Sequence, residues 1–322
     1  MAHTISFSDE EYKKAAEKWR KELLLIPMMA AKDSLRFMTG IPGVRGKLHV
    51  GTAASNAQFG PYKASKSSST TTDVKYRELE TFFGNACEDF EPNSVITTLL
   101  GEGASFLGDG QKVAPSAKLV LATVAKSLGE ALHNALFTAR RNEEGDTTAD
   151  LFNGFTTIAD AEVTAGNISA AKGNLLKITT GFSEADALDV AKTIERKAHP
   201  ALRAAKKFLY CSPEFADAYN DAYMLSHGGI VYNKQFEQAY VEGSSNRTTL
   251  APLPCLAGSN KFFLAPQSNM LYGYDNMSDV ENIQVDRFKP WFLTLSAAMF
   301  FGVQFYSIDP RMLLMVDVST EE

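Results

Sequence analysis

Cysteine, tryptophan and histidine are scarce in this chain of 322 residues, which contains three, two and five of them. Cys87, Cys211 and Cys255 are odd in number, lie far apart and form no CxxC pair. The sequence therefore predicts neither a zinc site nor a disulfide framework. The histidines show no HxH or HExxH spacing, so we expect no bound metal. We interpret His133 as a surface or hydrogen-bonded residue.

Long hydrophobic runs are also missing. The longest apolar stretch, residues 291–306, is shorter than the ~20 residues of a membrane-spanning helix and contains Thr294 and Ser296. The apolar run 23–31 is interrupted by Pro27 and follows a charged segment, unlike the core of a signal peptide. We therefore expect no membrane partner, and synthesis in the cytoplasm.

An excess of basic residues is absent as well. The chain has 32 Lys and Arg against 38 Asp and Glu, and a formal net charge of -6. Proteins that grip nucleic acid through phosphate contacts need clustered Lys and Arg, and no such run occurs here. A container whose inner wall merely lies near DNA remains compatible with this balance.

The motifs of nucleotide binding and nucleophilic catalysis are incomplete. Segment 101–108 has two glycines at phosphate-loop spacing, but Asp109 and Gly110 stand where Lys and Ser or Thr are required. The same segment fails as a nucleophile elbow because Leu107 occupies the place of the closing glycine. The sequence therefore predicts no catalytic residues and no cofactors, and indicates that the protein is not an enzyme.

Two long helical patterns are present. A capping box begins at Ser8, and the expected helix over residues 8–25 has only a thin apolar stripe around Tyr12 and Trp19. Such a helix is suited to clasping a neighbour. Leu and Ala at three- and four-residue steps predict a second helix over residues 115–141, which would be about 40 Å long.

Between these helices lies a region of loop and strand character. Residues 40–73 are punctuated by Gly and Pro and end in a Ser- and Thr-rich tract. Apolar and charged residues then alternate over an expected strand at residues 73–83, in which Tyr76 and Glu78 share one side and Arg77 lies on the other. The pattern predicts a long two-stranded excursion with a polar tip.

The second half of the chain alternates between strand and helix signals. Ser183 caps an expected helix over residues 183–197, and residues 207–211 form an expected buried strand. The Ser-Pro pair at 212–213 opens a helix that ends before residue 228. This alternation predicts a mixed α/β unit. The C-terminal part is rich in strand patterns, at residues 236–241, 261–264, 282–288 and 291–306.

Five short phrases resemble, in this order, the major capsid proteins of tailed bacteriophages. The first lies in the segment that leaves the extended loop, the second follows the long helix, the third covers the α/β strand and the start of its helix, and the last two belong to the closing β-segment: EDFEP, LFNGFTTI, FLYCSPE, NMLYGYD and AMFFGVQ. The resemblance implies an α+β chain with the HK97-like phage capsid fold. That fold combines an N-terminal arm, an extended loop, a peripheral domain with a long spine helix and an axial α/β domain.

The resemblance also implies boundaries and contact residues. The expected units are the arm at 1–45, the extended loop at 46–83, the peripheral domain at 84–182, the axial domain at 183–260, and strands returning to the peripheral domain at 261–322. Contacts between subunits are expected from the arm and the loop, at Tyr12, Trp19, Lys63, Lys66, Tyr76, Arg77 and Glu78. Because the arm begins almost at Met1, we expect no cleaved scaffolding segment on this chain.

The function implied is that of a major capsid protein, whose copies form hexamers and pentamers of an icosahedral shell around the phage genome. Implied partners are other copies of the chain, a portal protein, a separate scaffolding or accessory capsid protein, and double-stranded DNA packaged without sequence specificity. The implied location is the virion, after synthesis in the host bacterial cytoplasm. Three alternatives stay open: an encapsulin-like bacterial compartment, an unrelated enzyme with a cryptic site, and another virion protein such as a tail component.

Overall fold

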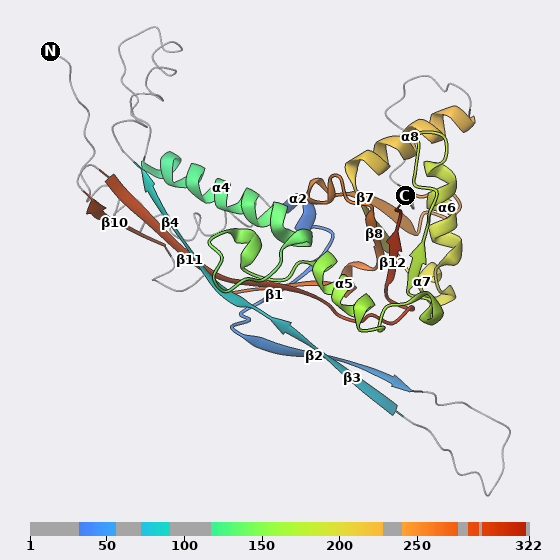
Figure 1. Cartoon of the computed structure of the whole chain (residues 1–322), viewed down its shortest axis with the longest axis horizontal. Helices are drawn as coiled ribbons and strands as arrows, with labels where there is room; N and C mark the ends of the chain where they lie inside the picture. The colour runs from blue at the N-terminus through green and yellow to red at the C-terminus, as the bar shows by residue number, and fades with distance from the viewer. Residues whose placement is uncertain are drawn as a thin grey trace, which may run out of the picture.

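The computed structural model describes residues 32–55, 72–90, 117–227, 240–275, 283–289 and 292–319. In these ranges the chain forms two five-stranded sheets, helices that pack on them, and a two-stranded hairpin that projects from the rest of the molecule (Figure 1). The expected helix over residues 8–25, the polar tip of the extended loop, the glycine-rich segment 101–108 and most of the expected strand 236–241 lie outside the described residues.

The helices pack against the two sheets. Their bounds are α2 Lys32–Leu35, α4 Ala117–Thr138, α5 Phe155–Thr164, α6 Ala187–Lys197, α7 Pro200–Ala204 and α8 Pro213–His227. Short 3-10 turns lie at η1 Thr148–Asp150, η2 Ala170–Lys172, η4 Pro254–Leu256 and η5 Gln267–Asn269. Helix α4 has 22 residues and confirms the predicted spine helix.

Helix starts were predicted with mixed success. Helix α8 begins as expected, because the Oγ of Ser212 accepts a hydrogen bond from the backbone N–H of Phe215 at 3.3 Å. The predicted start of α6 at Ser183 is wrong, since that helix begins at Ala187. The hydroxyl of Ser183 donates to the carboxylate of Asp186 at 3.0 Å, so Ser183 belongs to a turn before the helix.

The first sheet is organised around β11, its longest described strand. The strand order is β1-β9-β11-β10, and β4 pairs with the other edge of β11: β1 Thr39–Pro42, β4 Phe82–Phe90, β9 Met270–Tyr274, β10 Ile283–Lys289 and β11 Phe292–Phe305. β4 and β11 are antiparallel over nine residue pairs, from Leu293↔Phe90 to Phe301↔Phe82. The predicted strands at 282–288 and 291–306 are confirmed to within one residue at each end.

Aromatic rings join this sheet to the helices above it. The ring of Phe155 on α5 lies 5.3 Å from that of Phe137 on α4 and 5.2 Å from that of Phe305 on β11. The ring of Phe152 contacts that of Phe301 at 5.0 Å. These buried rings form the centre of the core under the spine helix, where aromatic pairs add to the free energy gained from burial.

The second sheet is covered on both faces. Its order is β5-β12-β8-β6-β7, with bounds β5 Leu175–Lys177, β12 Leu314–Asp317, β8 Lys261–Ala265, β6 Lys207–Cys211 and β7 Thr248–Pro252. Tyr210 and Phe263 face the core that contains α4, whereas Leu209 and Phe262 face a second core with α6 and α8. Burial on both faces explains the near-continuous apolar runs of β6 and β8.

The C-terminal segment divides between the two sheets, although the sequence predicted a single return to the peripheral domain over residues 261–322. Strands β8 and β12 pair with each other and belong to the same sheet as β6, while β9, β10 and β11 build the first sheet. Periodicity identifies a strand but not its partner, because pairing depends on packing against residues distant in sequence.

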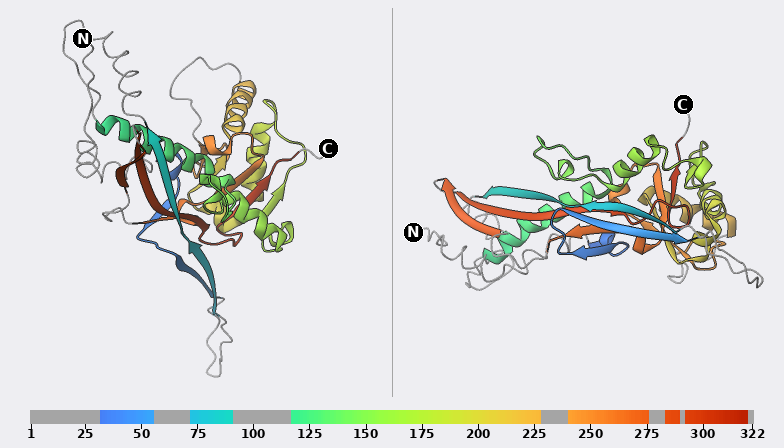
Figure 2. Two further views of the ribbon diagram at one scale, coloured as in Figure 1. Left: turned by 60° about the vertical axis from the view of Figure 1, so that its left-hand side comes forward. Right: turned by 90° about the horizontal axis from the view of Figure 1, so that it is seen from below.

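The predicted strand at residues 73–83 is in fact two strands with different partners. β3 Thr72–Glu80 pairs with β2 Lys47–Ser55, and β4 then pairs with β11. The chain continues from β3 into β4 without turning back, as the left view of Figure 2 shows. It changes partners at Thr81, which belongs to neither strand.

This change of partners takes place over two glycines. Gly302 of β11 is paired in register with Gly273 of β9. A Cβ at Gly302 would lie 2.0 Å from the carbonyl oxygen of Glu80, and one at Gly273 would lie 2.8 Å from the Cγ2 of Thr81. The β3–β4 junction therefore packs directly on the backbone of these two glycines, and any larger residue at either position would clash with it.

Replacing Gly302 with Ala should lower the free energy of unfolding by about 2 kcal/mol, because the clash is with backbone that cannot rotate away. Chemical denaturation of the full chain measures this. Gly51→Ala is the matched control, since a Cβ there would press only on the rotatable ring of Tyr76, at 3.2 Å, and the nearest backbone atom, the Lys75 oxygen, is at an ordinary 3.9 Å. Equal effects of the two substitutions would contradict the importance of the crossing.

Candidate functional site

The hairpin of β2 and β3 is the feature that most clearly leaves the body of the chain (Figure 1). The two strands are antiparallel from Lys47↔Glu80 to Ser55↔Thr72 and form a sheet of their own, which confirms the predicted two-stranded excursion. Within the described ranges, no third strand joins this sheet. One face of the hairpin, which carries the exposed Val74 and Tyr76, is open to contacts from outside.

The outward face of the hairpin presents large side chains to solvent. Val74 is 48% exposed and Tyr76 is 70% exposed. The ring of Tyr76 lies across Gly51 of the facing strand, to which it is paired in register. An exposed aromatic ring held by its own hairpin is a ready contact for another surface, because aromatic residues lose little conformational entropy on binding.

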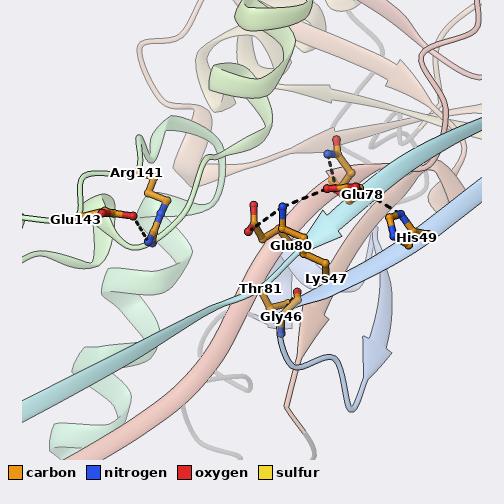
Figure 3. A network of polar contacts seen from close by, with 9 residues as sticks. Gly46, Lys47, His49, Glu78, Glu80, Thr81, Arg141 and Glu143 are labelled. Atoms are coloured by element: carbon orange, nitrogen blue, oxygen red, sulfur yellow. Dashed lines mark hydrogen bonds and ion pairs between the residues drawn. The ribbon is translucent and has the colours of Figure 1, made fainter.

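Charged side chains continue this face toward the root of the hairpin, as Figure 3 shows. The Nζ of Lys47 lies 3.4 Å from Oε2 of Glu78 and 3.6 Å from Oε1 of Glu80, and Nδ1 of His49 lies 3.6 Å from Oε1 of Glu78. The hydrogen bond to Glu78 and the attraction of both carboxylates raise the pKa of Lys47. Ion pairs in solvent contribute little to stability, so these groups shape the surface more than they hold the fold.

The root of the hairpin is tied to the body through Thr81. Its Oγ1 donates to the carbonyl of Val44 at 3.0 Å and accepts from the backbone N–H of Gly46 at 3.0 Å. Its own N–H donates to the carbonyl of Gly46 at 2.8 Å. Leu79 beside it is fully buried and packs near Gly273. Hydrogen bonds of Thr81 and the buried side chain of Leu79 together hold the root of the hairpin in place.

The structure places the predicted contact residues in three different settings. Tyr76 and Glu78 lie on the exposed face, as expected for residues that could meet another subunit. Arg77 points to the other side and pairs with Glu162 of its own chain at 2.9 Å, so it is engaged internally. The remaining members of the predicted set lie outside the described residues: Tyr12, Trp19, Lys63 and Lys66.

Other exposed apolar groups were not singled out from the sequence. Phe83 on β4 is 60% exposed and its ring lies 4.9 Å from that of Phe300 on β11. Met224 and Leu225 are exposed near the end of α8. Continuing the alternation of β3 past the partner change would have placed Phe83 on the same side as the buried Leu79, so its exposure does not follow from the pattern, and nothing local distinguishes Met224 and Leu225 from core residues.

One buried cluster has the residue types of a catalytic site. The Oγ of Ser34 lies 2.6 Å from Nε2 of His133 and 3.8 Å from Sγ of Cys255. Ser34 is fully buried, and burial raises the pKa of Cys255 to about 11, so the thiol stays protonated. The cluster joins α2, α4 and η4, and the prediction that His133 is a hydrogen-bonded residue is confirmed.

A groove of about 1070 Å³ runs between α4 and the β4–β11 pair. Small residues such as Gly84, Ala131 and Ala297 line it, together with acidic residues such as Glu143 and Asp150. No histidine or lysine is among the described residues that line it.

Elsewhere in the described ranges, His, Cys, Asp and Glu form no group of three suited to a metal ion. No described helix has both the length and the apolar character needed to cross a bilayer.

Comparison with known proteins identifies the fold by shape alone. No protein-family model matches the chain, and neither does any curated protein. Among solved structures, the satellite phage P4 procapsid (which includes the size determination protein) matches 92% of this chain and 90% of that chain, with a TM-score of 0.59 and 10% identity. The capsid of cyanophage A-1(L) matches 92% and 94%, with a TM-score of 0.54 and 12% identity. The chain has the HK97-like capsid fold. The predicted fold class is confirmed.

The same fold also occurs in a compartment shell. The SrpI encapsulin complex of Synechococcus elongatus matches 89% of this chain and 87% of that chain, with a TM-score of 0.51 and 12% identity. At identities this low the likeness concerns fold, and the role of the chain has to be argued from its own surface.

Replacing Thr81 with Val should lower the free energy of unfolding by about 1–3 kcal/mol, because the N–H of Gly46 and the carbonyl of Val44 lose a buried partner while the shape is kept. Urea denaturation measures the loss. Thr52→Val, on the half-buried side of β2, is the control and should change little. A Thr81 variant as stable as the parent would show that water replaces the lost contacts.

Proposed function

We propose that this chain is the major capsid protein of a tailed bacteriophage, whose copies assemble into the icosahedral shell that encloses the genome. The observation that carries the proposal is the match over about nine-tenths of the chain to phage capsid structures, combined with a hairpin whose outward face is open. A further capsid, that of a native GTA particle, matches with a TM-score of 0.53.

The hairpin supports self-assembly on physical grounds. A two-stranded ribbon that projects with Tyr76 and Val74 exposed buries little apolar area within its own chain. A second copy could cover this face, and full burial of an aromatic side chain contributes about 1.5–3 kcal/mol. In a closed shell every copy repeats the same contact, so a modest energy per contact suffices for assembly.

The proposal extends to partners and location. We infer that the chain binds other copies of itself in hexamers and pentamers, meets a portal protein and a separate scaffolding or accessory capsid protein, and lies in the virion close to non-specifically packaged DNA. We also infer a structural role without catalysis. This is supported by the kind of protein that shares the fold, since the matching structures are of capsids and a compartment shell.

An encapsulin-like compartment is the second candidate, favoured by the match to the encapsulin of Synechococcus elongatus. The two functions differ in what the shell contains. Particles purified from their natural source should contain double-stranded DNA if the first proposal holds. A shell filled with one cargo protein and free of DNA would instead support the compartment.

Replacing Tyr76 with Ala should leave the isolated subunit folded, because the residue is 70% exposed in its own chain, and should reduce the yield of particles at least tenfold, because a neighbouring copy loses the aromatic contact. Sedimentation and electron microscopy of the expressed full chain measure the yield, and thermal unfolding checks the fold. A tenfold weakening of one contact corresponds to about 1.4 kcal/mol, and because every copy in a shell repeats the contact, a smaller loss per contact suffices for a tenfold fall in yield.

Tyr76→Phe is the matched control, since it keeps the ring that covers Gly51. The control should assemble nearly as well as the parent. Normal particle yield from Tyr76→Ala would remove this face from the proposed interface. Failure of the parent chain to form any closed particle, alone or with its neighbouring gene products, would count against the function itself.

A further inference from the structure

We propose that Arg77, held by Glu162 and Gln304, sets the direction in which the β2–β3 hairpin leaves the body, and thereby where one copy meets the next. The first part of this inference concerns a single chain. The second part rests on the proposed function. Arg77 acts here as a positioning residue inside its own subunit, whereas the sequence predicted a contact between subunits.

The hairpin has an inner anchor at the crossing over the first sheet. The backbone of Glu80 lies directly on Gly302, and Leu79 is fully buried beside it. These contacts hold the position of the root tightly. A single point of close contact leaves the hairpin free to rotate about that point, so the direction needs a second anchor.

The second anchor lies farther out along β3. The Nη2 of Arg77 is 2.9 Å from Oε1 of Glu162 on α5 and donates to Oε1 of Gln304 on β11 at 2.9 Å. The Nε2 of Gln304 donates to the carbonyl of Glu78 at 2.9 Å. The orientation of this amide is determined, because the backbone N–H of Phe305 donates to the same Oε1 at 3.0 Å.

Strand β2 is held from the same side. The hydroxyl of Tyr306, which follows β11, donates to the carbonyl of Gly51 at 3.1 Å. Body residues from α5 and the end of β11 therefore contact both strands of the hairpin beyond the crossing. Two separated anchors define a line, and that line is the direction of the hairpin.

Because the hairpin is long, a small change in its direction moves its outer end by a large distance. At about 3.3 Å per residue, Arg77 lies roughly 13 Å along the chain from Thr81, and the described end of β3 at Thr72 lies about 30 Å away. A rotation of about 10° at the crossing would therefore move Thr72 by about 5 Å, which is close to the spacing between neighbouring strands. The same rotation moves Tyr76, about 16 Å from the crossing, by about 3 Å, which is enough to disturb its packing on a partner surface.

The energetics of the ion pair favour an orienting role. The side chains of Arg77 and Glu162 are 15% and 19% exposed, so both charges have lost most of their water. The Nε of Arg77 is buried and has no hydrogen-bond partner among the described residues. An imperfectly satisfied, desolvated pair adds little net stability, yet it is strongly directional. Replacing one partner leaves the other charge desolvated and unpaired, so a single substitution should alter the direction of the hairpin and also lower the stability of the fold.

The test measures hairpin direction in the unassembled full chain by pulsed electron paramagnetic resonance. One spin label replaces exposed Val74, and a second is placed on the body at Lys197 in one sample and at Glu144 in another, both of which are exposed. Cys87→Ser removes the exposed native thiol, whereas the other two cysteines are buried. The parent should give one narrow distance distribution for each pair.

Arg77→Leu should shift the mean of at least one distance by about 4 Å, as a rotation of about 10° at the crossing would, or double its width. Glu162→Gln should act in the same direction while keeping the hydrogen bond that Asn167 donates to the parent carboxylate at 2.7 Å. Lys75→Leu is the matched control, because it removes a positive charge from an exposed position on the same face of β3. It should leave both distances unchanged. Because Arg77→Leu and Glu162→Gln each leave one member of the pair without its charged partner, both should also unfold below the parent temperature, whereas Lys75→Leu should unfold at nearly the parent temperature.

Unchanged distances in both Arg77→Leu and Glu162→Gln would overturn the positioning role. A shift in distance together with particles of normal yield and diameter would overturn its link to assembly. Reduced yield or altered diameter in Arg77→Leu, with Lys75→Leu normal, would support both parts. If the parent chain forms no particles, the proposed function fails, while the distances still decide whether Arg77 directs the hairpin.

Discussion

The contact between the β3–β4 junction and the paired glycines Gly302 and Gly273 is the constraint on which the rest of the structure depends. It lets one continuous run of chain belong first to the hairpin and then to the main sheet. Backbone can approach backbone this closely only where no Cβ intervenes. Without this crossing, β3 could not leave the body and the hairpin would have no defined root.

The two faces of the hairpin have different roles: one attaches the hairpin to its own subunit, and the other is exposed. The inward side of the hairpin carries the buried Leu79 and the internally paired Arg77, and it is bound to α5 and β11. The outward side carries Tyr76 and a solvated ion network around Lys47. Because strand side chains alternate, one ribbon can be fixed to its own subunit on one face and offer the other face to a neighbour.

The low identity to solved capsids fits this picture. Chains that share only 10–12% of their residues with this one match it over roughly nine-tenths of its length. What must be kept for such a fold is the pairing of strands around β11, a helix across that sheet, and a second sheet buried on both faces. Many apolar sequences satisfy these demands, provided that volume and pattern are preserved.

Local patterns in the sequence determined the elements whose signals are contained within them. The spine helix α4, strand β6 and helix α8 follow from helical spacing, an apolar run and a Ser-Pro start, since each depends on neighbours a few residues away. The alternation of β3 likewise placed Tyr76 and Arg77 on opposite faces before any partner was known. The resemblance of short phrases supplied the fold class, but it gave no contact between them.

Only the tertiary structure decided what those faces meet. Gly273 and Gly302 lie in two of the recognised phrases, yet their pairing under Glu80 joins three distant segments. Arg77 contacts Glu162, with strand β4 and helix α4 between them in the chain, and Gln304, which lies 227 residues away in sequence. The division of residues 261–322 between two sheets has the same origin. Short-range periodicity specifies which side of an element is buried, whereas partners far apart in sequence are selected by packing of the whole chain.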